Sequence, residues 1–224
     1  MQRIDKSNTL STEYKEWMEA FEEKGENHAK YYSGHKFYPD VKFALLKCQN
    51  GLCAYTEMKL CQKKFLIDAH WKEGRYFLEE QKTSGDIEHF DSTLKETQGW
   101  LWDNLFVVES ETNKHKSTQV VDNILKPDLE DYDPLERMEF DIELNVYIAN
   151  TENNSAKKQR RINAMIETLG INFPGAVQTR RKPFLNRILK QIELGVFELS
   201  EYIDDEFPTL VRFLNQQFNQ KINQ

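Results

Sequence analysis

Gly85-Asp86-Ile87-Glu88-His89-Phe90 is a short segment typical of a β-strand, in which an acid directly precedes a histidine. Trp102-Asp103-Asn104-Leu105 follows after a polar stretch and leads into a second apolar, β-prone run. Thr112-Asn113-Lys114-His115-Lys116 then lies in the first part of a helix that we expect over residues 110–125. Strand, loop, strand and helix therefore follow one another within a short part of the chain.

Polar side chains in this part of the chain suit the hydrolysis of a phosphodiester bond. Neutral histidine deprotonates water near pH 7, so His89 is the candidate general base. A hard divalent cation stabilises the transition state and prefers oxygen ligands, which Glu88 and Asn113 can supply. Asp86 competes with Glu88 for this metal. Since both residues face away from His89 in a regular strand, the ligand must use the strand end or a bulge. Asn104 is the candidate for fixing the loop.

Each of these residues also has an ordinary structural role, which the sequence leaves open. An acid–histidine pair can lie on a surface, and Asn104 can satisfy the backbone of its own loop. Asn113 can cap a helix. The three stretches in this order, rather than any one residue, indicate a ββα-metal finger.

The same residues resemble the HNH endonucleases, also called His-Me finger nucleases. Glu88-His89 matches their acid–histidine pair, Asn104 their middle asparagine, and Asn113 their third position, which is histidine or asparagine. The nine-residue step from Asn104 to Asn113 is also that of the HNH domain in RNA-guided CRISPR effectors. The resemblance implies a ββα-metal nuclease core that uses one Mg²⁺ or Mn²⁺ ion.

The resemblance covers roughly residues 38–182. In its details, this part of the chain is similar to the HNH proteins of Septu (PtuB-like) and of some retron antiphage defence systems. The resemblance implies a nuclease acting on nucleic acid, for which DNA is the first expected substrate and RNA stays open. Its partner would be an ABC-type ATPase (PtuA-like) or a retron complex. The alternative is a catalytically inactive, HNH-derived interaction subunit of such a complex. The resemblance is carried by segments 38–45, 51–57, 87–90, 102–105, 124–127 and 169–172 and by Arg180.

One part of the family pattern is missing. The resembling proteins usually hold a structural zinc ion with two CxxC pairs, which here read Cys53-Ala54-Tyr55-Thr56 and Glu109-Ser110-Glu111-Thr112. Three of the four thiols are absent, and one cysteine does not build a tetrahedral zinc site. We therefore expect no structural zinc, and the loss of these thiols favours the inactive alternative.

The net charge of −7 conceals a basic segment over residues 155–190. The segment carries nine Lys or Arg and one acid, Glu167, so its charge is +8 and the remainder of the chain is −7 − 8 = −15. Such a segment is typical of a surface that binds a polyanion or an acidic partner, although a solvated helix face has the same composition. The candidate nucleic-acid or partner-binding residues are Lys157, Lys158, Arg160, Arg161, Arg180, Arg181 and Lys182.

The composition fits a folded chain of 224 residues with 39% hydrophobic residues and no apolar run of membrane-spanning length. Three cysteines without a framework spacing indicate a reducing, cytoplasmic location. We expect an α+β fold with an N-terminal helical segment at 1–37, the HNH core at 38–127 and a mostly helical C-terminal lobe at 128–224. The expected helices are 11–23, 40–49 with Asp40 as N-cap, 69–81, 110–125, 156–169, one around 184–192 and one from Pro208, with a hairpin at 138–148.

Overall fold

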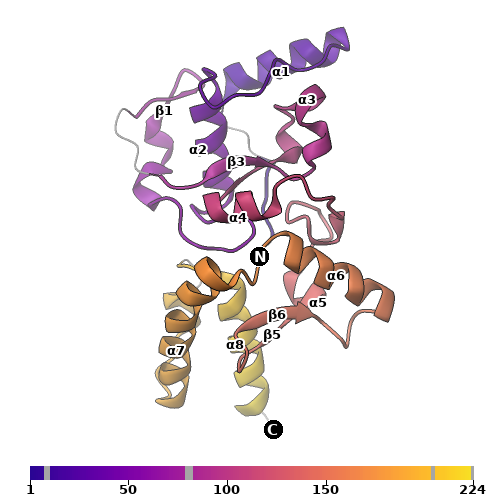
Figure 1. The fold of residues 1–224 in the computed structure, drawn as a ribbon. Helices are drawn as coiled ribbons and strands as arrows, with labels where there is room; N and C mark the ends of the chain where they lie inside the picture. Colours follow the sequence, from indigo (N-terminus) through magenta and orange to yellow (C-terminus); the bar gives the residue numbers. More distant parts are fainter. Residues whose placement is uncertain (8–10, 79–82, 203–204, 223–224) are drawn as a thin grey trace. The chain divides into compact units, whose positions relative to one another are not determined.

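The computed structural model of the chain describes residues 1–7, 11–78, 83–202 and 205–222 (Figure 1). The chain divides into two compact units. The N-terminal unit comprises Ile4–Ala54 and Lys59–Val121, and the C-terminal unit comprises Met1–Arg3, Tyr55–Met58 and Asp122–Gln224. Helices and small antiparallel sheets make up both units, so the predicted α+β class is confirmed.

The N-terminal unit contains the elements that surround Glu88 and His89. Its sheets are the antiparallel pairs β1–β2 and β3–β4. The α-helices and strands are α1 (Thr12–Lys24), α2 (Tyr38–Cys48), β1 (Trp71–Lys72), β2 (Arg75–Tyr76), β3 (Asp86–His89), α3 (Lys95–Gln98), β4 (Leu105–Val108) and α4 (Ser110–Lys116). The short 3₁₀ turns are η1 (Lys63–Phe65), η2 (Asp68–His70), η3 (Ser92–Leu94) and η4 (Trp102–Asn104).

The hairpin β3–β4 is the core of this unit. Glu88 pairs with Phe106 and His89 with Leu105 across the two strands. All four residues of β4 are buried, and α2 packs against this strand. On the edge of β4 that faces away from β3, the backbone of Val107 bonds to the side chain of Gln49. This side chain accepts the Val107 N–H at 2.9 Å and donates to the Val107 carbonyl at 2.8 Å. The edge of β4 that faces away from β3 is therefore hydrogen-bonded at this residue.

The first helix forms as its sequence predicts. The Ser11 hydroxyl caps α1 by accepting the N–H of Tyr14 at 3.2 Å, and Gly25 ends the helix with a φ of 61°. The second helix differs from the prediction, because α2 begins at Tyr38 and Asp40 is not its N-cap. The Asp40 carboxylate instead accepts the N–H of Tyr76 at 2.9 Å and pairs with Arg75, so it ties α2 to β2.

Two other helix predictions are wrong in part. Residues 69–78 form η2 and the strands β1 and β2 instead of a helix, because Glu73 and Gly74 both take positive φ in a tight hairpin turn. Residues 79–81 of that expected helix lie outside the described residues. The helix expected over 110–125 ends at Lys116, where Ser117 has a φ of 49° and a run rich in β-branched residues follows.

The C-terminal unit is mostly helical around one hairpin. Its elements are η5 (Asn123–Leu125), α5 (Pro134–Arg137), β5 (Met138–Asp141), β6 (Val146–Ala149), α6 (Ala156–Thr168), the π-helical turn η6 (Pro174–Gln178), α7 (Thr179–Glu193), η7 (Leu199–Glu201) and α8 (Pro208–Ile222). Figure 1 shows α6 beside the β5–β6 hairpin, and the two are packed together. The predicted hairpin, the helix after Ser155 and the helix from Pro208 are confirmed.

None of the helices in the described part of the chain combines the length and the apolar character that crossing a bilayer requires.

Candidate functional site

The candidate site residues lie on β3, on the turn before β4, and on α4. His89 is the last residue of β3, Asn104 the last residue of η4, and Asn113 lies within α4. Because β3 and β4 pair antiparallel, the end of β3 lies beside the start of β4. The helix α4 follows β4 after one residue and packs against β3. The hairpin and the helix thus bring together residues from all three predicted stretches.

Asn104 joins the two ends of the intervening loop. Its side-chain oxygen accepts the N–H of Asp91 at 2.8 Å, and its side-chain nitrogen donates to the Asp91 carbonyl at 2.9 Å. Its own carbonyl accepts the N–H of Phe90 at 2.8 Å. The side chain is buried, so these bonds are shielded from water. These bonds hold Phe90 and Asp91, the two residues after His89, against Asn104.

His89 has one ring nitrogen engaged with the backbone. Its Nε2 lies 2.8 Å from the carbonyl oxygen of Gly99. Since a carbonyl can only accept, Nε2 carries the proton and Nδ1 keeps a lone pair. Burial lowers the pKa of His89 to about 4, against the raising effect of the Gly99 carbonyl, and Lys95 and Lys116 lower it further. The ring is therefore neutral at pH 7, and it is only 4% exposed.

Glu88 is bound to a lysine for which the sequence predicts no role. The Nζ of Lys116 lies 2.6 Å from Glu88 Oε1 and 3.0 Å from the carbonyl oxygen of His89. Glu88 is 4% exposed, and the Lys116 side chain is fully buried. Lys116 lies four residues after the buried Thr112 on α4, which packs against β3, but no local pattern in the sequence pairs it with Glu88.

The other two candidate ligands are more accessible. Asp86 is exposed, and its carboxylate accepts the hydroxyl of Ser110 at 2.7 Å. Asn113 is half-buried and lies one turn before Lys116 on α4. No group of three or more His, Cys, Asp or Glu side chains in the described ranges is arranged to hold a metal ion. A site made of Glu88, Asn113 and Asp86 has only two carboxylates and one amide, all of them oxygen donors of the kind that Mg²⁺ prefers.

Cys53 contacts the residue that precedes α4. The Cys53 sulfur accepts the backbone N–H of Glu109 at 3.4 Å. The Glu109 carboxylate then caps α4 by accepting the N–H groups of Glu111 and Thr112, each at 2.9 Å. Hydrogen bonds therefore join Cys53 to Glu109 and Glu109 to the first turn of α4.

We expect the purified protein to contain no stoichiometric zinc, and chelators to leave its melting temperature unchanged. A structural zinc ion would contribute directly to the free energy of folding, and this donor set lacks the thiolates to bind one. Metal analysis of unsupplemented protein and thermal melts with and without chelator test this. One tightly bound zinc ion per chain would contradict it and would direct attention to Cys53, Cys61 and His70 as ligands.

The basic segment lies in the C-terminal unit, and the structure corrects one of its residues. The sequence predicts Arg181 at a binding surface, but its side chain is fully buried, so it does not reach a phosphate backbone in this structure. Arg161 is held by two contacts to Asp122 at 2.6 and 2.7 Å, and Arg180 pairs with Glu206.

The remaining candidates of the basic segment lie on α6 and α7. Lys157 and Arg160 are exposed on α6, Lys158 is half-buried there, and Lys182 is exposed on α7. Lys157 and Arg160 are three residues apart and lie on the same side of their helix. The exposed side of α6 is therefore the strongest candidate for a polyanion surface.

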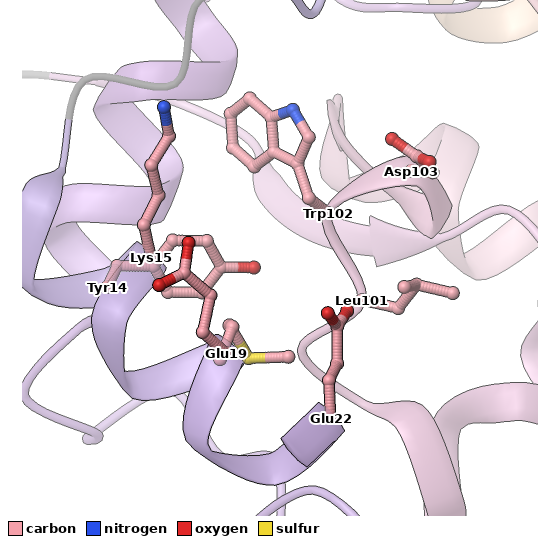
Figure 2. A pocket seen from close by; sticks show the side chains of 8 residues that line it. Tyr14, Lys15, Glu19, Glu22, Leu101, Trp102 and Asp103 are labelled. Atoms are coloured by element: carbon pink, nitrogen blue, oxygen red, sulfur yellow. The ribbon is translucent and has the colours of Figure 1, made fainter.

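The N-terminal unit also contains a cavity of about 320 Å³. Figure 2 shows Glu19 and Glu22 of α1 and Trp102 from the segment before β4 around this space. Asp103 adds a third carboxylate to the lining, and Lys15 is its basic residue. Because carboxylates outnumber basic groups, this cavity does not suit a phosphate-rich ligand.

Comparison with known proteins found no family model that matches the chain and no similar protein among the curated ones.

Proposed function

We propose that the chain is an HNH-type, metal-dependent endonuclease that hydrolyses phosphodiester bonds in nucleic acid, with DNA as the first substrate to test. The observation that carries the proposal is the arrangement of His89 at the end of β3. Its Nε2–H donates to the Gly99 carbonyl, which leaves Nδ1 as the basic nitrogen. A neutral imidazole oriented by a backbone carbonyl has the form that a general base needs.

The other residues take the roles that surround such a base. Nδ1 of His89 accepts a proton from the attacking water, and Asn104 keeps the loop between the strands in place. Glu88 and Asn113, with Asp86 as an alternative ligand, are the residues that would hold one Mg²⁺ or Mn²⁺ ion. When bound, this ion supplies positive charge for the phosphoryl oxygens and the leaving oxygen.

The burial of the site supports control by a partner. His89 and Glu88 are each only 4% exposed, so a nucleic acid reaches them only after local opening. By resemblance, the partner is an ABC-type ATPase (PtuA-like) or a retron complex, and the setting is antiphage defence. An uncontrolled nuclease would cut the DNA of its own cell, so a closed resting site is consistent with such a role.

A second candidate function is a catalytically inactive, HNH-derived subunit that binds its partner. The buried pair of Glu88 and Lys116 favours it, because an ammonium group already neutralises the carboxylate expected to bind metal. An assay of nucleic-acid cleavage with Mg²⁺, with Mn²⁺ and with chelator, using the chain alone and with its partner, separates the two. Cleavage that requires the metal supports the nuclease. Its absence under every condition, with partner binding intact, supports the subunit.

We expect nucleic-acid binding to weaken steeply with salt through the exposed side of α6. The double variant Lys157→Ala/Arg160→Ala should flatten the slope of log K against log salt by about 0.9 for each duplex phosphate that it no longer neutralises. Arg180→Ala is the control, because its guanidinium group is paired with Glu206 and should contribute less. Binding titrations at several salt concentrations measure the slope.

A different result would reassign this surface. If the double variant keeps its nucleic-acid affinity and salt slope but no longer binds the partner ATPase, the basic side of α6 is a docking surface for that partner.

A further inference from the structure

Lys116 is the last residue of α4, and its side chain is fully buried. Lysine is almost never fully buried unless its charge is paired. The ammonium group lies 2.6 Å from the Glu88 carboxylate and 3.0 Å from the His89 carbonyl oxygen. It therefore sits between the side chain expected to bind metal and the backbone of the expected general base.

The contacts of this ammonium group are those that a divalent ion would use. Mg²⁺ and Mn²⁺ bind carboxylate and carbonyl oxygens, and these are the two kinds of oxygen that Lys116 contacts. A buried cation next to the Glu88 carboxylate repels a second cation strongly, because the low local dielectric weakens screening. The ammonium group and a metal ion thus compete for the same carboxylate.

We propose that Lys116 occupies the cation position of the candidate site, so that a divalent ion binds Glu88 only when it displaces the ammonium group. This inference rests on the proposed function, since it concerns the metal site of that activity. It gives the site two arrangements, one closed by Lys116 and one open to metal. A partner that binds near the end of α4 and moves Lys116 away from Glu88 would raise the affinity of the site for the metal ion.

The place of Lys116 in the fold suits this exchange. The residues directly after it, 117–120, are exposed, and Ser117 has a positive φ where the helix ends. The last turn of a helix gives up fewer backbone hydrogen bonds on moving than the middle does. Lys116 can therefore leave Glu88 by a local change at the end of α4 while β3 and β4 stay paired.

Binding of Mn²⁺, followed by the spin-resonance signal of the free ion, tests the inference without an activity assay. Lys116→Met replaces the lysine with an unbranched, uncharged side chain that is one atom shorter. We expect this variant to bind Mn²⁺ at least about tenfold more tightly than the unmodified chain, because a buried like charge has been removed. Lys114→Met is the control, because Lys114 is an exposed lysine of the same helix and should leave the affinity unchanged.

Thermal melts give a second measure of Mn²⁺ binding, which can be used if Lys116→Met folds poorly. That variant leaves Glu88 buried without its ammonium partner, so its melting temperature should fall and Mn²⁺ should restore it. The double variant Glu88→Gln/Lys116→Met has no buried charge at this pair. It should fold without metal, and Mn²⁺ should not raise its melting temperature.

The outcomes separate this inference from the proposed function. Equal Mn²⁺ affinity in the unmodified chain and in Lys116→Met overturns the inference, even if the chain cleaves DNA. Failure of Mn²⁺ to bind or stabilise Lys116→Met overturns it as well. Tighter Mn²⁺ binding by Lys116→Met that depends on Glu88 supports it, even if no variant cleaves DNA and the nuclease proposal fails.

Discussion

Replacing His89 by alanine is expected to lower the rate of metal-dependent cleavage by about 10²–10⁴-fold, the usual contribution of a general base. The neutral ring, with its Nε2–H bonded to Gly99, keeps Nδ1 ready to accept a proton at pH 7. Alanine removes that acceptor, so the attacking water must be deprotonated by solvent. Single-turnover cleavage of a labelled DNA in Mg²⁺, with the partner present where the chain requires it, measures the loss.

His115→Ala is the matched control, because His115 is a half-buried histidine on α4 that the proposal gives no role as a base. It should cleave within about threefold of the unmodified chain, well short of the loss expected for a general base. His89 is buried, so the melting temperature of each variant must be compared before the rates are interpreted. His89→Gln, which keeps a donor for Gly99, should lose the rate while disturbing the fold less. Undiminished cleavage by a folded His89→Ala protein would rule out the assigned base.

Replacing Arg181 by methionine is expected to destabilise the C-terminal unit by about 3–5 kcal/mol, because several buried neutral acceptors lose their donor at a cost of about 1–3 kcal/mol each. The guanidinium group donates to the carbonyl oxygens of Asn145 at 2.7 Å and Ile171 at 3.1 Å. It also donates to the side-chain oxygens of Asn145 at 3.2 Å and Asn172 at 3.1 Å. Its cation lies 5.0 Å from the ring centre of Tyr147. Methionine would leave several buried acceptors without a donor.

The neighbouring residue supplies the control for Arg181. Arg180 is exposed and paired with Glu206, so Arg180→Met should change the free energy of unfolding by about 1 kcal/mol or less. Urea unfolding followed by circular dichroism measures both variants, and the transition of the C-terminal unit is the one to compare. Equal, small effects would show that the Arg181 network contributes little to stability.

The sequence predicts the helices and strands that are specified by residues close together in the chain, such as caps, turn residues and apolar spacing. Ser155 and Gly170 bracket α6, and the apolar spacing of Ile162, Met165 and Ile166 gives its buried side. The hairpin around Asn145 was predictable for the same reason, because alternation and turn chemistry act over a few residues. The helix expected over 69–81 does not form over the described residues 69–78, because Glu73 and Gly74 take positive φ values in a tight hairpin turn.

The order of the candidate site residues can also be predicted from the sequence. The burial and the partners of their side chains cannot. The acid–histidine pair, Asn104 and Asn113 are predicted from residue type and spacing, and in the structure Asn104 bonds to Asp91 at the start of the loop. The pairing of Glu88 with Lys116 joins two residues that are 28 positions apart. No local pattern specifies such a contact, because it depends on how α4 packs against β3.

The sequence by itself therefore determined the α+β class, the strand–loop–strand–helix order around His89 and the position of the basic segment. Only the tertiary structure decided which basic side chains of that segment are exposed and which are buried or paired. Arg180, Arg181 and Lys182 look alike in the sequence, but Arg181 shares a helix side with Phe184, Leu185 and Ile188 and is buried with them. The physical reason is that helix and strand formation depend on neighbouring residues, whereas the state of a charge depends on its burial and its partner, which only the packing of distant segments provides.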